Sequence, residues 1–116
     1  MQHRDKIILQ KIISEIDIGT KLLGDAPLDV FLQDEMQKRA IGMTTINIGE
    51  LVKNVTMELR EMHPEVPWKP IAGFRDITAH RYQTLRMEDV YQTVKIDFPI
   101  IRRQLLGILK ESERSC

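Results

Sequence analysis

Cysteine is nearly absent from this chain of 116 residues, and aromatic residues make up only 5% of it. The single cysteine is Cys116, so no disulfide can form within the chain, which is typical of a reducing compartment. No apolar run approaches the ~20 residues needed to span a bilayer, and the first residues do not resemble a signal peptide. We therefore expect a cytoplasmic protein with no membrane partner.

Neither sign of charge predominates, because 17 Lys and Arg residues balance 17 Asp and Glu residues. A broad basic surface for nucleic acid is disfavoured, since such binding requires many phosphates to be neutralised. A small local basic site stays open. The length and the 42% of hydrophobic residues are typical of one globular core, so we expect residues 1–116 to form a single helical domain.

Apolar residues at spacings of three and four predict an all-α fold, a bundle of four or five helices. The predicted helices run from Asp5 to Leu23, from Leu28 to His63, from Trp68 to Ala79 and onward from Met87. The last contains Pro99, where we expect a kink or a break into two helices. The residues expected in the core are Ile8, Leu9, Ile12, Ile13, Ile16, Ile48, Val52, Val55, Leu59, Met62, Trp68, Ile71, Phe74, Ile77, Met87, Val90, Val94, Phe98, Ile101, Leu105 and Ile108.

The predicted second helix has about 36 residues and would be roughly 50 Å long. Besides its core row it carries a second row on another side, formed by Met36, Ala40 and Met43 and continued by Asn47, Glu50 and Asn54. A helix that is apolar on two sides usually has two neighbours, which here would be its own bundle and another subunit. The pattern therefore predicts a two-fold homodimer or a higher oligomer.

The segment RDITAHRY, from Arg75 to Tyr82, concentrates groups that handle phosphates and protons. Arginine binds phosphate oxygens through a planar fork of donors, and histidine transfers protons near neutral pH. Arg75 and His80 would lie about 140° apart on an ideal helix. They can share a site only if the helix ends near His80 or if they meet across a subunit interface.

These residue types suit RNA cleavage without a metal ion or other cofactor. A base takes the proton of the 2′-hydroxyl, the oxygen attacks the adjacent phosphorus, and a cation stabilises the added charge. A dimer would bring two copies of the motif together. A solvated surface cluster is the structural alternative. Asn47 and Glu50 either support such a site or form a hydrogen-bonded pair at an interface.

The stretches PEVPWKPIAGFRDITAHRY, from Pro64 to Tyr82, and NIGE, from Asn47 to Glu50, resemble the HepT-like family of the HEPN superfamily. The family's Pro-Trp, Ile-Ala-Gly and Arg-polar-x3-His-x-Tyr pattern falls on Pro67, Trp68, Ile71, Ala72, Gly73, Arg75, Asp76, His80 and Tyr82. MEDVYQTVKIDFPIIRRQL follows in the same order, so the resemblance covers essentially the whole chain. Asp76 stands where the family often has Asn.

The resemblance implies a ribonuclease toxin with a cleft between two protomers. Arg75 and His80 would be catalytic, and Asp76 would support them. The partner would be an MntA-type nucleotidyltransferase antitoxin that transfers AMP to Tyr82. Arg81 and Arg86 are candidates for RNA or nucleotide contact. Two alternatives stay open, a non-catalytic nucleotide- or substrate-binding partner of a minimal nucleotidyltransferase and a structural dimerisation bundle.

Overall fold

The computed structural model describes residues 1–76 and 86–114, with only the backbone for residues 75, 76 and 114. Its elements, in chain order, are α1 (His3–Leu23), α2 (Leu28–Gln33), α3 (Glu35–Lys53), α4 (Met57–Met62), α5 (Trp68–Ala72), the 3-10 turn η1 (Gly73–Asp76), α7 (Met87–Gln92), the π-helical turn η2 (Thr93–Asp97) and α8 (Phe98–Arg114). These two ranges contain no strand, so the predicted all-α fold is confirmed.

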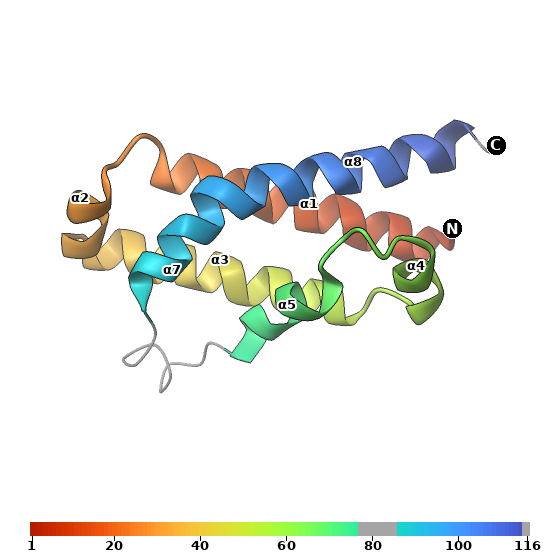
Figure 1. Ribbon diagram of the computed structural model, residues 1–116, viewed down its shortest axis with the longest axis horizontal. Coiled ribbons are helices and arrows are strands. Elements are labelled where there is room, and N and C mark those ends of the chain that lie inside the picture. The colour runs from red at the N-terminus through yellow and green to blue at the C-terminus, as the bar shows by residue number, and fades with distance from the viewer. Residues whose placement is uncertain (77–85, 115–116) are drawn as a thin grey trace.

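The three long helices α1, α3 and α8 run along the long axis of a body that measures 48 × 28 × 20 Å. Helix α1 packs against both α3 and α8, while α5, η1 and α7 pack along α3 (Figure 1). Within the described ranges no helix is long and apolar enough to cross a membrane.

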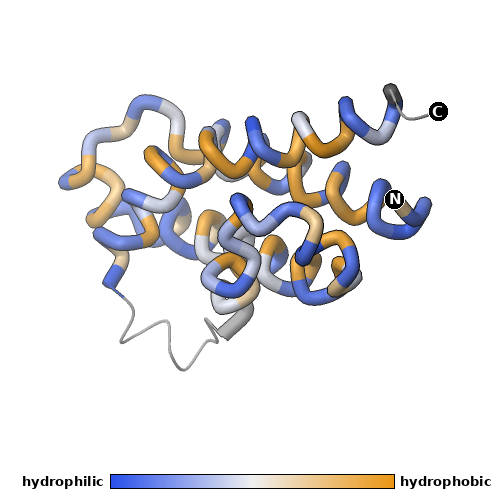
Figure 2. The backbone as a smooth tube through the Cα atoms, turned by 45° about the vertical axis from the view of Figure 1, so that its right-hand side comes forward, coloured by the Kyte–Doolittle hydropathy of each residue, from blue (hydrophilic) through white to orange (hydrophobic). Residues whose placement is uncertain are grey.

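The core lies between these helices, where the apolar sides of the three long elements meet. Figure 2 shows hydrophobic and hydrophilic residues alternating around each long helix, as expected for helices that are buried on one side only. Nearly all of the predicted core residues are buried, including every one predicted for α1 and for α7 to α8. Phe74 is half-buried against the core. Met62 is 65% exposed, so its prediction was wrong, and Ile77 lies outside the described residues.

The prediction of one long helix from Leu28 to His63 was also wrong, because the helix is interrupted twice and forms α2, α3 and α4. The first break is at Asp34, whose side chain accepts a hydrogen bond from the backbone N–H of Gln37 at 3.0 Å. The second lies between α3 and α4, where the Thr56 hydroxyl accepts from the N–H of Leu59 at 3.3 Å. Asp and Thr favour the N-cap because their side chains satisfy an N–H that the helix leaves unpaired.

A buried carboxyl group holds the second break in place. Asp5 of α1 is 1% exposed and accepts hydrogen bonds from the Thr56 backbone N–H at 3.0 Å and the Thr56 hydroxyl at 2.6 Å. A buried acceptor is costly if it is left unpaired, so these bonds favour a helix end at Thr56 over a continuous helix. The break turns α4 relative to α3 and leaves Met62 outside the core.

The expected irregularity near Pro99 is confirmed, and it takes the form of the π-helical turn η2. The N–H of Phe98 donates to the carbonyl of Thr93, five residues earlier instead of four. Pro99 has no N–H to continue an α-helical ladder, and its ring would clash with the carbonyl four residues back. The wider turn relieves that clash while α7 and α8 keep their apolar sides on the core.

Candidate active site

The first half of the RDITAHRY segment lies at the end of a short helix that is fixed on α3. Helix α5 starts after Pro67, and Pro70 lies in its first turn, where a missing N–H costs nothing. After Ala72 the chain tightens into η1, which ends at Asp76. The predicted helix from Trp68 to Ala79 is therefore an α turn followed by a 3-10 turn up to Asp76, and its last three residues lie outside the described part.

Trp68 and Ile71 hold α5 in position, since both are buried. The indole N–H of Trp68 donates to the carbonyl of His63 at 2.9 Å, which satisfies the polar atom of a buried ring. His63 in turn lies with Nδ1 3.2 Å from a carboxylate oxygen of Glu65. Because η1 directly follows α5 and packs against α3, the backbone at Arg75 has a fixed place on the outside of α3.

The residues predicted to carry the chemistry are only partly within the described structure. The backbone of Arg75 and Asp76 lies in η1, and their side chains lie outside the described part. His80, Arg81 and Tyr82 also lie outside it. The relation between Arg75 and His80 therefore stays a prediction.

Arg86 lies just before the first turn of α7, at the other end of the segment that carries His80. It is exposed, and its Nε is 3.6 Å from a carboxylate oxygen of Glu88. An exposed pair of this kind holds a side chain only weakly. Arg86 is therefore available to exchange that carboxylate for an anionic ligand.

Asn47 and Glu50 lie on the outer side of α3, whereas Ile48 and Gly49 between them are buried. Asn47 is half-buried and Glu50 is exposed. Both line a shallow hollow of ≈ 340 Å³ between α1 and α3, together with Lys11 and Glu15. Their two predicted roles, support of the active site or a hydrogen-bonded pair at a subunit interface, stay predictions.

The sequence matches the family Ribonuclease HepT-like over residues 12–108. This range includes α3 with Asn47 and Glu50 and the whole stretch from Arg75 to Tyr82. The chain belongs to the HepT-like ribonuclease family.

Several relatives are similar to this chain over almost their full length. "Putative RNase TTE0752" of Caldanaerobacter subterraneus is 31% identical over 90% of this chain and 94% of its own. "Putative RNase MJ0125" of Methanocaldococcus jannaschii is 32% identical over 97% of this chain and 98% of its own. "Probable ribonuclease HepT" of Thermococcus cleftensis is 28% identical over 88% and 93%. No solved structure gives a significant match.

Arg60 is a residue of this HepT-like chain that the sequence pattern did not single out. Its Nη2 donates to the carbonyl of Val52 at the end of α3, at 2.6 Å. Its Nε is buried and has no hydrogen-bond partner among the residues that the structure describes. The only local signal is a cation in a short amphipathic stretch, and its contact with Val52 requires the break between α3 and α4, which the apolar pattern did not reveal.

Proposed function

We propose that this protein is an RNA endonuclease that works without a metal ion and serves as the toxin of a toxin–antitoxin system. The observation that carries the proposal is the match to the HepT-like ribonuclease family over residues 12–108, a range that contains Arg75, Asp76, His80 and Tyr82 in the family's order. The packing of η1 against α3 supports it, because a catalytic cation is effective only when its backbone is held in place.

In the proposed reaction His80 acts as the base that removes the proton of a 2′-hydroxyl. The 2′-oxygen forms a bond to the adjacent phosphorus while the bond to the 5′-oxygen breaks, which leaves a 2′,3′-cyclic phosphate and a 5′-hydroxyl. Arg75 stabilises the negative charge that develops on the phosphate oxygens. Asp76 supports this pair by orienting His80.

The leaving 5′-oxygen needs a proton, and we assign that role to His80 of a second protomer. A two-fold dimer fits the surface of α3, where Met36 is 82% and Met43 is 58% exposed. Ile18 and Leu22 of the neighbouring α1 are exposed as well. Together they form an apolar face that a second copy of the chain would cover.

An MntA-type nucleotidyltransferase is the antitoxin in this proposal, and it transfers AMP to the Tyr82 hydroxyl. The modification adds a phosphate two residues away from His80. That phosphate carries a negative charge and fills space close to the catalytic pair, so it competes with RNA for Arg75 and its basic neighbours. The toxin would be switched off without being unfolded.

The first experiment is digestion of a total RNA pool by the purified protein in EDTA, with His80→Ala as the comparison. The wild type should cut and leave cyclic phosphate ends, and His80→Ala should be slower by about 100-fold or more, the usual contribution of a general base. Mass spectrometry of the tryptic peptide with Tyr82 tells whether the preparation already carries AMP.

Tyr82→Phe is the control for the antitoxin arm. It should cut RNA like the wild type and should stay active in the presence of the nucleotidyltransferase and ATP. A wild-type protein with an unmodified Tyr82 that leaves the RNA pool intact would contradict the nuclease assignment and would favour a non-catalytic binding partner of the nucleotidyltransferase.

A further inference from the structure

A groove of ≈ 470 Å³ lies between α4 and α5, on the side of the molecule that carries η1. Its wall is largely apolar and includes Met57, Pro67, Trp68 and Pro70. Pro67 and Pro70 are exposed, whereas Trp68 is buried and contributes only an edge. The groove ends at Ala72, the residue directly before η1.

Among the described residues, two cations, Arg60 and Lys69, line this groove and no carboxylate does. Within residues 1–76 and 86–114 neither cation is paired with an acidic side chain. The chain as a whole has a formal net charge of zero. Two cations with no carboxylate among the described lining residues therefore make this groove locally positive. A locally positive groove attracts an anion.

Arg60 is held ready for such a ligand. The bond from its Nη2 to the Val52 carbonyl fixes the guanidinium at the wall of the groove, so little conformational entropy remains to be lost on binding. Lys69 is exposed and free to adapt. Arg60 is thus a hydrogen-bond donor whose position is fixed before binding, and Lys69 is a charge that can move to meet the ligand. This combination suits the oxygens of a phosphate.

We propose that this groove is a subsite for single-stranded RNA that binds the nucleotide next to the cleaved bond. Arg60 and Lys69 contact its phosphate, and its base lies on the exposed proline rings and Met57. The groove leads directly to η1, where Arg75 is assigned the reacting phosphate, so one strand can occupy both. This inference rests on the proposed ribonuclease function. It adds that the groove sets the register of the RNA, that is, which bond of the strand lies at the catalytic residues.

The test is binding of an RNA that cannot be cut. A fluorescein-labelled single strand of about a dozen nucleotides, with 2′-O-methyl groups throughout, is titrated by anisotropy at several salt concentrations. The variants are Lys69→Gln and Arg60→Gln, and Lys110→Gln is the control, because Lys110 is an exposed lysine of α8 that does not line the groove. Each lost phosphate contact should lower the slope of log K against log salt by about 0.7, and Lys110→Gln should leave it unchanged.

Lys69→Gln decides the matter, because the Lys69 side chain makes no hydrogen bond or ion pair that the fold needs among the described residues. If its slope and dissociation constant equal those of the wild type, the subsite is wrong. Wild-type cleavage with that same result would leave the proposed function standing. Binding that depends on Lys69, without cleavage of an ordinary RNA by protein whose Tyr82 is unmodified, would support an RNA site in the groove but refute the nuclease and with it the place of that site beside a cleaved bond.

Trp68 is the only tryptophan of the chain and reports directly on the groove that it lines. Its emission should shift when the uncleavable RNA binds, and the shift should be lost in Lys69→Gln. A short peptide of alternating Glu and Leu is the competing probe. A shift with this peptide and none with RNA would overturn the proposal and assign the groove to an acidic protein segment.

Discussion

At the scale of single residues, Gly19 lies at a close approach of α1 to two other helices. A Cβ atom built on it would lie 2.9 Å from Cε2 of Phe98 and 3.1 Å from Cγ2 of Thr44. Both neighbours are buried side chains of other helices, so neither can move without disturbing the core. The glycine is needed here for space, since its backbone is ordinary helix.

We predict that Gly19→Ala destabilises the protein by about 1–3 kcal/mol, the usual cost of an extra atom in a packed core. Gly107→Ala in α8 is the matched control, because its added methyl group meets nothing within 4 Å. Alanine is the better helix former there and should stabilise by about 0.5–1 kcal/mol. Urea denaturation gives both free energies. Equal signs for the two changes would refute the close approach.

At the scale of helices, the joint between α3 and α4 depends on the buried contact of Asp5 with Thr56. Asp5→Ala leaves the half-buried N–H and hydroxyl of Thr56 without their acceptor and should cost about 3 kcal/mol. Asp34→Ala removes only an exposed cap and should cost about 1 kcal/mol. Chemical denaturation followed by circular dichroism measures both. A loss for Asp5→Ala no larger than that for Asp34→Ala would contradict the stabilising role of the contact between Asp5 and Thr56.

The same joint explains which helices the sequence could predict. The apolar rows of α1 and of α7 to α8 can be read from the local sequence alone, and Pro99 by itself predicts the irregularity near it. The end of α3 is different, because the capping role of Thr56 depends on Asp5, which lies 51 residues away along the chain. Asp34 and Thr56 are both residue types that favour an N-cap, but only the cap at Asp34 is made without a partner distant in the sequence.

The candidate site divides in the same way. Arg75 and Asp76 stand out by their order within the family pattern, which needs no coordinates. Arg60 could not be found from the sequence, because it lines the same groove as Lys69 only as a result of the change of direction between α3 and α4. The two cations line one groove because α4 and α5 lie on either side of it, and no spacing in the sequence encodes this arrangement.

At the scale of the whole molecule, the exposed apolar face of α1 and α3 predicts how two chains meet. Met43→Glu should weaken the proposed dimer at least tenfold, which corresponds to about 1.4 kcal/mol, because a charge would be buried in its interface. Cleavage of RNA should fall with it. Met62→Glu is the control, since Met62 on α4 is exposed to 65% against 58% for Met43.

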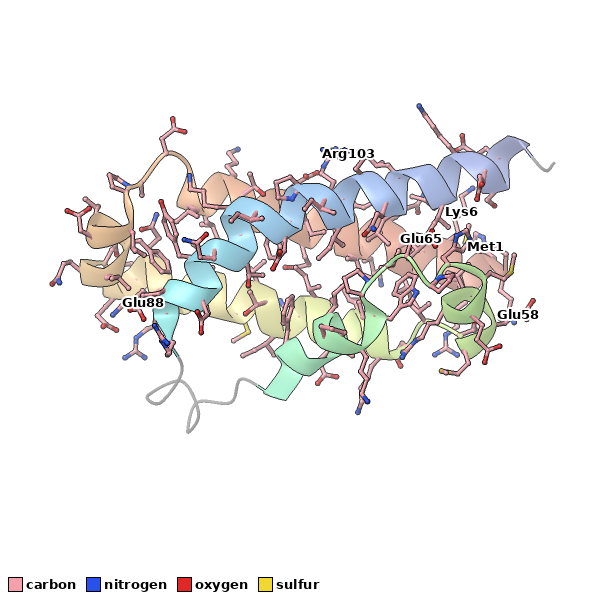
Figure 3. The ribbon with its side chains drawn as sticks, in the orientation of Figure 1. Met1, Lys6, Glu58, Glu65, Glu88 and Arg103 are labelled. Atoms are coloured by element: carbon pink, nitrogen blue, oxygen red, sulfur yellow. The ribbon has the colours of Figure 1, made fainter. Side chains whose placement is uncertain are left out.

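Light scattering after gel filtration measures the mass of each variant over a range of concentrations. A wild-type chain that stays monomeric while it cuts RNA would refute the shared site. The same would follow if both glutamate variants dissociated equally. Figure 3 shows Glu58 on α4, at the end of the molecule where the N-terminus lies, so the control change falls on a helix that is already acidic.

The π-helical turn before Pro99 also bears on how the length of this chain can vary. A π turn holds one residue more than an α turn, so it is equivalent to an insertion that the fold has absorbed. Deleting the exposed Ile96 would restore an α turn with both flanking helices still facing the core, but it would return the clash at Pro99. The extra residue and the proline should therefore be gained or lost together among related chains, and a one-residue gap in an alignment belongs between Thr93 and Asp97.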